Sequence, residues 1–201
     1  MSADILIDNK IGMDYETYLN LFKMQVDEPN STDVSDMKWY EFRKLNLQRT
    51  LRLEKHFIPS DDLINVISST QYSQTWLVLT ESWCGDSAQN LPIIAKVASL
   101  NTKINLRIVP RDENLELMDK YLTNGSRSIP KLIVFDNKNN ELFKWGPRPA
   151  EAQNLFSKLK NEGLDKSEIN KQLHLWYGKN RGKEVEKELI VLLKKVNVNL
   201  N

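Results

Sequence analysis

The sequence contains little cysteine, histidine or glycine, and each shortage excludes a class of protein. Its 201 residues include one cysteine, Cys84, so the chain cannot form an internal disulfide. Two histidines, His56 and His174, together with a single thiol cannot supply a recognisable zinc-ligand spacing, so we assign no metal. The seven glycines are scattered and form no phosphate-binding loop, so the sequence implies no nucleotide cofactor.

Long apolar runs and an excess of one charge are also missing. The best apolar candidates, residues 76–79 and 189–193, are far shorter than the roughly 20 residues that cross a bilayer. Lys and Arg total 28 against 27 Asp and Glu, so no net field attracts nucleic acid or an anionic membrane. Residues 1–10 lack the basic and then apolar pattern of a signal peptide. We therefore expect a cytoplasmic protein that binds neither nucleic acid nor membrane, and its oligomeric state stays open.

The chain does contain an ordered succession of amphipathic helices and short apolar segments. Four apolar segments predict strands, at residues 76–79, 104–109, 131–135 and 141–145. Helical periodicity is present at residues 15–26, from 35 or 36 to 57, and at 60–67, 87–100, 114–122, 150–159, 166–176 and 184–196. Strands that alternate with helices and end in a hairpin predict an α/β fold, with a mixed central sheet and helices on both faces.

The length suits one hydrophobic core with decorations at both ends. We predict an N-terminal helical extension at residues 1–59, a central α/β domain at 60–162, and C-terminal helices at 163–201 packed on the same domain. Residues 177–182 are interpreted as a linker between the last two helices. Several aromatic residues of the two extensions are expected to pack onto the sheet: Trp39, Tyr40, Phe42, Trp176 and Tyr177.

The single thiol stands where a predicted strand gives way to a helix. A helix N-terminus stabilises a thiolate through its free N–H groups and its dipole. Ser87, three residues after Cys84, can offer a hydroxyl and a backbone N–H to the sulfur, whereas the carboxylate of Asp86 disfavours the thiolate. Gly85 permits a tight turn, and Trp83 shields one side of the sulfur. We predict a moderately lowered pKa for Cys84.

Five consecutive residues resemble the Trp-Cys-Gly-Pro-Cys active site of the thioredoxin family: Trp83, Cys84, Gly85, Asp86 and Ser87. Pro92 and Gly146 also match family positions, and Ile129-Pro130 stands where that family carries a cis-proline. The resemblance implies a thioredoxin-like three-layer α/β/α sandwich with helical extensions, as in a bacterial subgroup of thioredoxin-like proteins. By the same resemblance, Cys84 and Ser87 are the catalytic residues, and the substrate-binding residues are Trp83, Gly85, Asp86, Ile129 and Pro130.

Two departures from the family pattern limit the chemistry that the resemblance implies. The second cysteine of the family is Ser87 here, and the buried acid of the family falls at Val78, so no dithiol cycle can run within this chain. The resemblance then implies a monothiol thiol–disulfide oxidoreductase that acts on a protein or small-molecule disulfide. It would have no resident cofactor and would use an external low-molecular-weight thiol, such as glutathione, to release the mixed disulfide.

Two other readings of the single thiol stay open. Cys84 can form a stable mixed disulfide or a sulfenic acid, so that the protein acts as a trap or a sensor. The alternative is a non-catalytic thioredoxin-like module that binds protein partners through the same groove.

Overall fold

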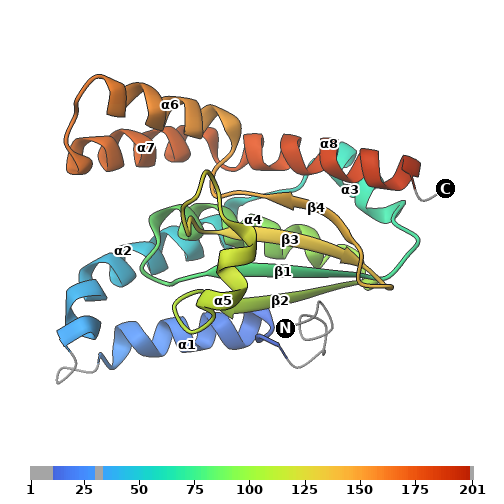
Figure 1. The fold of residues 1–201 in the computed structure, drawn as a ribbon, viewed down its shortest axis with the longest axis horizontal. Helices are drawn as coiled ribbons and strands as arrows, with labels where there is room; N and C mark the ends of the chain where they lie inside the picture. Colours follow the sequence, from blue (N-terminus) through green and yellow to red (C-terminus); the bar gives the residue numbers. More distant parts are fainter. Residues whose placement is uncertain (1–10, 30–33, 200–201) are drawn as a thin grey trace.

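The computed structural model describes residues 11–29 and 34–199 of the chain (Figure 1). The sequence prediction about a leader pattern at residues 1–10 lies outside the described residues. The predicted helix cap at Ser35 or Asp36 is wrong, because the helix at Val34–His56 already includes both residues.

A mixed four-stranded sheet forms the centre of the molecule. The strands are β1 (Gln74–Thr80), β2 (Ile104–Pro110), β3 (Lys131–Asp136) and β4 (Glu141–Trp145). Their order is β2-β1-β3-β4, with β1 parallel to β2 and β3 antiparallel to both β1 and β4. Leu77 of β1 pairs with Arg107 on one side and with Ile133 on the other. The four strands predicted from the sequence are all present, in one mixed sheet.

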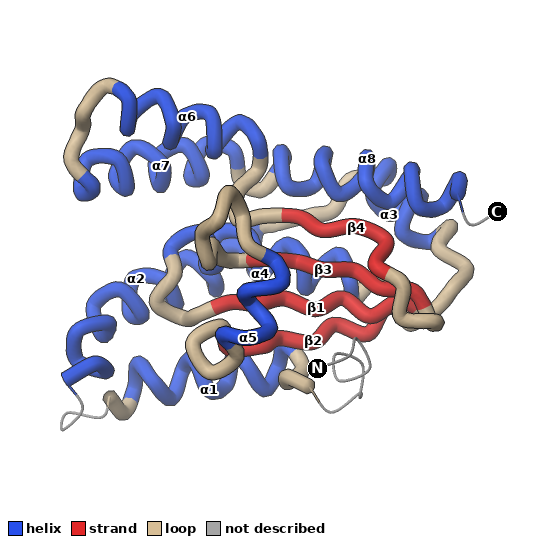
Figure 2. The backbone as a smooth tube through the Cα atoms, in the orientation of Figure 1, coloured by secondary structure: helices blue, strands red, loops and turns tan. Residues whose placement is uncertain are grey.

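Helices precede the sheet, cross between its strands and follow it (Figure 2). They are α1 (Tyr15–Asp27), α2 (Val34–His56), α3 (Asp61–Ser68), α4 (Gly85–Ala98), α5 (Leu115–Met118) with the 3-10 turn η2 (Asp119–Tyr121), α6 (Ala150–Asn161), α7 (Lys166–Asn180) and α8 (Lys183–Asn199). The predicted linker at residues 177–182 is wrong, because α7 continues through Gly178. Only Arg181 and Gly182, both in the left-handed conformation, separate α7 from α8.

The alternating side chains of the strands divide the core between the two faces of the sheet. Trp76 and Val78 of β1 lie in a cluster that includes buried residues of α1, α3, α4 and α8. Leu77 and Leu79 face the other way, where α5 and η2 cover them. A third cluster joins α6 to α7. This arrangement is the predicted three-layer α/β/α sandwich with helical extensions, while the predicted domain boundaries stay a prediction.

None of the helices in the described ranges is long and apolar enough to cross a membrane.

The close approach of two loops at Gly146 generates a prediction about stability. Gly146 has a φ of 107°, and a Cβ atom there would overlap the carbonyl oxygen of Pro130. Gly163 also has a positive φ, of 78°, but open space surrounds it. We expect Gly146→Ala to lower the free energy of unfolding by about 3 kcal/mol or more, and Gly163→Ala by about 1 kcal/mol. Urea unfolding measures both, and equal losses would show that the contact with Pro130 is relieved without cost.

Candidate functional site

Cys84 occupies the junction between β1 and α4. The backbone turns after Thr80, and the N–H of Cys84 donates a hydrogen bond of 3.1 Å to the carbonyl of Glu81. Cys84 itself is extended, with φ −81° and ψ 118°, and it is the N-cap residue of α4. Its carbonyl accepts the first hydrogen bond of the helix, from Ala88. The buried strand and the helix therefore determine the position of the sulfur together.

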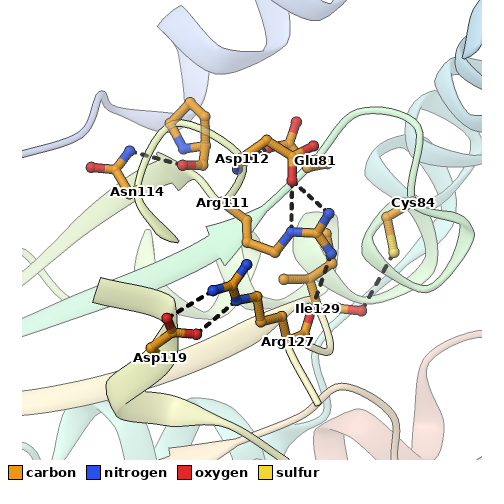
Figure 3. Close-up of polar contacts among 9 residues, drawn as sticks. Glu81, Cys84, Arg111, Asp112, Asn114, Asp119, Arg127 and Ile129 are labelled. Atoms are coloured by element: carbon orange, nitrogen blue, oxygen red, sulfur yellow. Dashed lines mark hydrogen bonds and ion pairs between the residues drawn. The ribbon is translucent and has the colours of Figure 1, made fainter. Parts of the chain in front are cut away.

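The sulfur points at the loop that precedes β3. Cys84 Sγ lies 3.4 Å from the carbonyl oxygen of Ile129, to which the thiol donates a hydrogen bond (Figure 3). The Ile129–Pro130 peptide bond is cis. Ile129 and Pro130 are buried, and only 9% of Cys84 is exposed. Residues that are 45 positions apart in the sequence thus meet at the sulfur, in the arrangement that the family resemblance implies.

Burial and, to a smaller extent, the carboxylate of Asp86 raise the pKa of Cys84 to about 11. The hydroxyl and backbone N–H of Ser87 and the backbone N–H of Asp86 act in the opposite direction, with smaller effects. The predicted lowering of the Cys84 pKa is therefore wrong, because the loss of hydration outweighs the hydrogen bonds at the start of the helix. The predicted opposing effect of the Asp86 carboxylate is confirmed.

Ser87 is buried beneath the sulfur at the first turn of α4. Its Oγ has no hydrogen-bond partner of good geometry within the described part of the chain, yet it is close enough to the sulfur to lower the pKa of Cys84. The protonated thiol of Cys84 donates to Ile129, so Ser87 is left to donate to a thiolate. This arrangement stabilises the thiolate whenever it forms.

Asp86 is the centre of a buried polar network that sequence reasoning missed. Its carboxylate forms an ion pair of 2.7 Å with Arg148 and accepts a hydrogen bond of 2.8 Å from the hydroxyl of Tyr177. That hydroxyl accepts in turn from the side chain of Asn90, at 3.3 Å. Burial raises the pKa of Asp86, and Arg148 opposes this effect. A buried carboxylate requires a counter-ion or hydrogen-bond donors. The only signal for this network in the sequence was therefore the acid itself, directly after the Cys84-Gly85 pair.

Trp83 lies under an aromatic residue of the N-terminal extension. The rings of Trp39 and Trp83 are stacked, with centroids 4.7 Å apart, and the guanidinium of Arg111 lies 4.9 Å from the Trp83 ring. The prediction that aromatic residues of the extensions pack onto the sheet is thus wrong for Trp39. It is also wrong for Phe42, which is 52% exposed, and for Tyr177, which binds Asp86.

Arg111 also ties together the loops around the site (Figure 3). It pairs with Asp112 and donates to the carbonyl of Arg127, while the Arg127 side chain forms an ion pair of 2.7 Å with Asp119. The side chain of Arg127 is therefore already engaged within the protein.

The two N-terminal helices hold the turn that precedes Cys84. The buried side chain of Asn46 in α2 donates to the carbonyl of Ser82, at 3.1 Å. The hydroxyl of Ser82 donates to the side chain of Gln25 in α1, at 2.8 Å. Because both contacts are to the turn itself, α1 and α2 are part of the site.

The side of Gly85 that faces α7 is covered by an imidazole ring. A Cβ atom on Gly85 would lie 2.8 Å from the ring of His174 and 3.7 Å from the Arg49 guanidinium. Burial and, to a smaller extent, the charges of Arg49, Arg148 and Arg52 lower the pKa of His174 to about 4. His174 is consequently neutral at pH 7, and glycine is the residue that fits beneath it.

Within the described ranges, no group of three or more His, Cys, Asp or Glu side chains could hold a metal ion.

Solved structures share this arrangement of sheet and helices. A protein of unknown function from Pseudomonas aeruginosa matches with a TM-score of 0.62 and 17% identity, over 92% of this chain and 93% of that one. An HIV epitope-scaffold matches with a TM-score of 0.56 and 18% identity, over 91% of this chain and 99% of that one. These similarities establish that solved structures share this fold, an α/β sandwich with helical extensions. No curated protein sequence matches the chain.

The sequence pattern of a family described as Thioredoxin matches residues 35–160, and this chain belongs to that family. The match begins at the start of α2 and ends in α6. It thus includes the helix that supplies Trp39 and Asn46 to the site, although sequence analysis assigned that helix to an extension outside the family resemblance.

The position of Asp86 predicts how one substitution changes the thiol. We expect Asp86→Asn to lower the pKa of Cys84, so that the midpoint of its alkylation by iodoacetamide falls by about one pH unit. Asp112→Asn is the control, because it removes the same charge from a carboxylate beside Arg111. An unchanged midpoint in the Asp86 variant would show that its charge does not reach the sulfur.

The low pKa of His174 predicts a loss of stability in acid. The unfolded chain binds a proton at this histidine near pH 6.5, whereas the folded chain does so only near pH 4. The free energy of unfolding should therefore decrease as the pH falls from 6.5 to 4, with about 2 kcal/mol of the decrease due to this residue. In denaturant titrations, His174→Gln should reduce the slope in that interval and His56→Gln, at an exposed site, should not. Equal slopes in all three proteins would contradict the assignment.

Proposed function

We propose that this protein carries out monothiol thiol–disulfide exchange through Cys84, with an external thiol completing the cycle. The observation that carries the proposal is the position of the sulfur. It lies at the N-terminus of α4, 3.4 Å from the carbonyl of Ile129 and close to the buried hydroxyl of Ser87, which lowers the pKa of Cys84. A disulfide that approaches along the Ile129-Pro130 loop would meet a nucleophile whose thiolate has hydrogen-bond donors in place. Trp83, Gly85 and Asp86 would border the same approach.

The exchange needs no second cysteine. The Cys84 thiolate attacks one sulfur of a disulfide, a new sulfur–sulfur bond forms at Cys84, and the other sulfur leaves as a thiolate that takes up a proton. An external thiolate, such as that of glutathione, then attacks the sulfur bound to Cys84. A new disulfide forms between the external thiol and that sulfur, and Cys84 leaves as a thiolate that takes up a proton. The two electrons that reduce the first disulfide come from external thiols, and no resident cofactor takes part. A reducing, cytoplasmic compartment suits this supply of thiols.

The protonation of Cys84 limits the rate of this reaction. With a pKa of about 11, only about one molecule in ten thousand carries the thiolate at pH 7. Exchange in the free protein should accordingly be slow. Substrates that displace the Ile129 hydrogen bond, or that bring donors of their own to the sulfur, should react faster.

The same burial favours a second candidate function. A redox-inactive thioredoxin-like protein that binds protein partners at the surface around Cys84 would also contain a thiol with 9% exposure and a raised pKa. In that case Cys84 acts as a small apolar residue, and its replacement by serine leaves partner binding intact.

Mass spectrometry after exposure to oxidised glutathione distinguishes the two functions. Because Cys84 is the only cysteine, every adduct reports on it. We expect glutathionylation that accelerates about tenfold per pH unit between pH 7 and pH 10, follows the thiolate fraction, and is reversed by reduced glutathione.

Two variants provide the controls. Cys84→Ser should form no adduct, and Ser87→Ala should react several-fold more slowly than the natural protein, because its thiolate loses a donor. If no adduct forms even at pH 10, or if reduced glutathione cannot remove it, the exchange function fails and the binding function replaces it.

A further inference from the structure

Two arginines of α2 and a histidine of α7 gather around the backbone at the start of α4. Arg49 and His174 both contact the space in front of Gly85, and Arg52 is close enough to depress the pKa of each of them. Arg52 is exposed, Arg49 and His174 are half-buried, and Gly85 is next to Cys84 in the chain. Arg52, Arg49 and His174 therefore form a continuous polar group that begins at the solvent and ends at Gly85.

Positive charge exceeds negative charge at this place. The one carboxylate that acts on Arg49 is that of Asp86, and its closest partners are Arg148 and Tyr177. Arg49 donates one hydrogen bond, of 2.8 Å, to the side chain of Asn46, and within residues 11–29 and 37–198 it forms no ion pair. Burial and the neighbouring Arg52 lower the pKa of Arg49 to about 10, so the guanidinium remains charged at pH 7.

A half-buried guanidinium without an ion-pair partner has lost hydration that only an anion restores in full. The fork of a guanidinium fits a carboxylate through two parallel hydrogen bonds. His174 is neutral, so it can donate or accept through one ring nitrogen without adding a charge.

We propose that Arg49, Arg52 and His174 form a binding site for the carboxylate of a small thiol that forms, or resolves, the mixed disulfide at Cys84. This inference rests on the proposed exchange function and specifies its co-substrate: a thiol that carries a carboxylate within a few bonds of its sulfur. The site anchors the small thiol, while Ser87 and the backbone stabilise the Cys84 thiolate.

Three aliphatic disulfides of similar size test the preference for a carboxylate: dithiodipropionate, which is anionic, bis(2-hydroxyethyl) disulfide, which is neutral, and cystamine, which is cationic. The rate of adduct formation at Cys84 is followed by mass spectrometry at pH 8 and low ionic strength. We expect the anionic reagent to react about tenfold faster than the neutral one, and cystamine to react slowest. The preference should shrink in high salt.

Matched variants locate the effect. Arg52→Gln should abolish most of the anionic preference while leaving the rate with the neutral disulfide within about twofold. Arg52 is exposed, so its replacement does not put folding at risk. Lys44→Gln removes a charge from an exposed position of the same helix and should keep the full preference.

The outcomes separate the inference from the exchange function. If the natural protein reacts equally with the three reagents, the carboxylate site is overturned while the exchange function stands. If no reagent modifies Cys84, the exchange function fails, and only a binding measurement can then test the carboxylate site.

That measurement uses S-methylglutathione, which cannot exchange. It should raise the Tm of Cys84→Ser but not that of Cys84→Ser combined with Arg52→Gln. Equal Tm shifts in the two proteins would overturn the site.

Discussion

The buried carboxylate of Asp86 is the contact on which the arrangement of the site depends. It joins the first turn of α4 to Arg148, in the loop after β4, and to Tyr177 in α7. Removing either partner of a buried ion pair leaves an uncompensated charge, at a cost of roughly 3–5 kcal/mol. The loop and the C-terminal helices are therefore restrained relative to the thiol by one side chain that lies two positions from it.

That same carboxylate restrains the chemistry of the thiol. A cysteine at a helix N-terminus usually ionises easily, because N–H groups and the helix dipole favour the thiolate. At Cys84, burial under the Trp83 turn and the charge of Asp86 outweigh these groups. Only the hydroxyl of Ser87 is left to favour ionisation from a side chain. The features that build a defined site thus also keep its nucleophile protonated.

The sequence was informative wherever a property is local. Apolar runs and helical periodicity predicted the four strands and the succession of helices, and one short motif predicted that Cys84 would meet Ile129-Pro130. The degree of burial of a side chain depends on what packs over it, so the raised pKa of Cys84 was not accessible from the motif. Tyr177 was assigned to a linker because glycines follow it at 178 and 182. Tertiary packing of α7 outweighs the low helix propensity of Gly178.

The two ends of the chain both contribute to the site, since α1 and α2 hold the turn before Cys84, and α7 supplies Tyr177 and His174. This has a consequence for biosynthesis, in which a chain grows from its N-terminus. Cys84 leaves the ribosome together with the helices that stack on its turn, but well before the residues that neutralise and cover Asp86. During that interval the nascent thiol has neither its final exposure nor its final charge environment, so the properties of this cysteine are established only after Arg148 and Tyr177 have been synthesised.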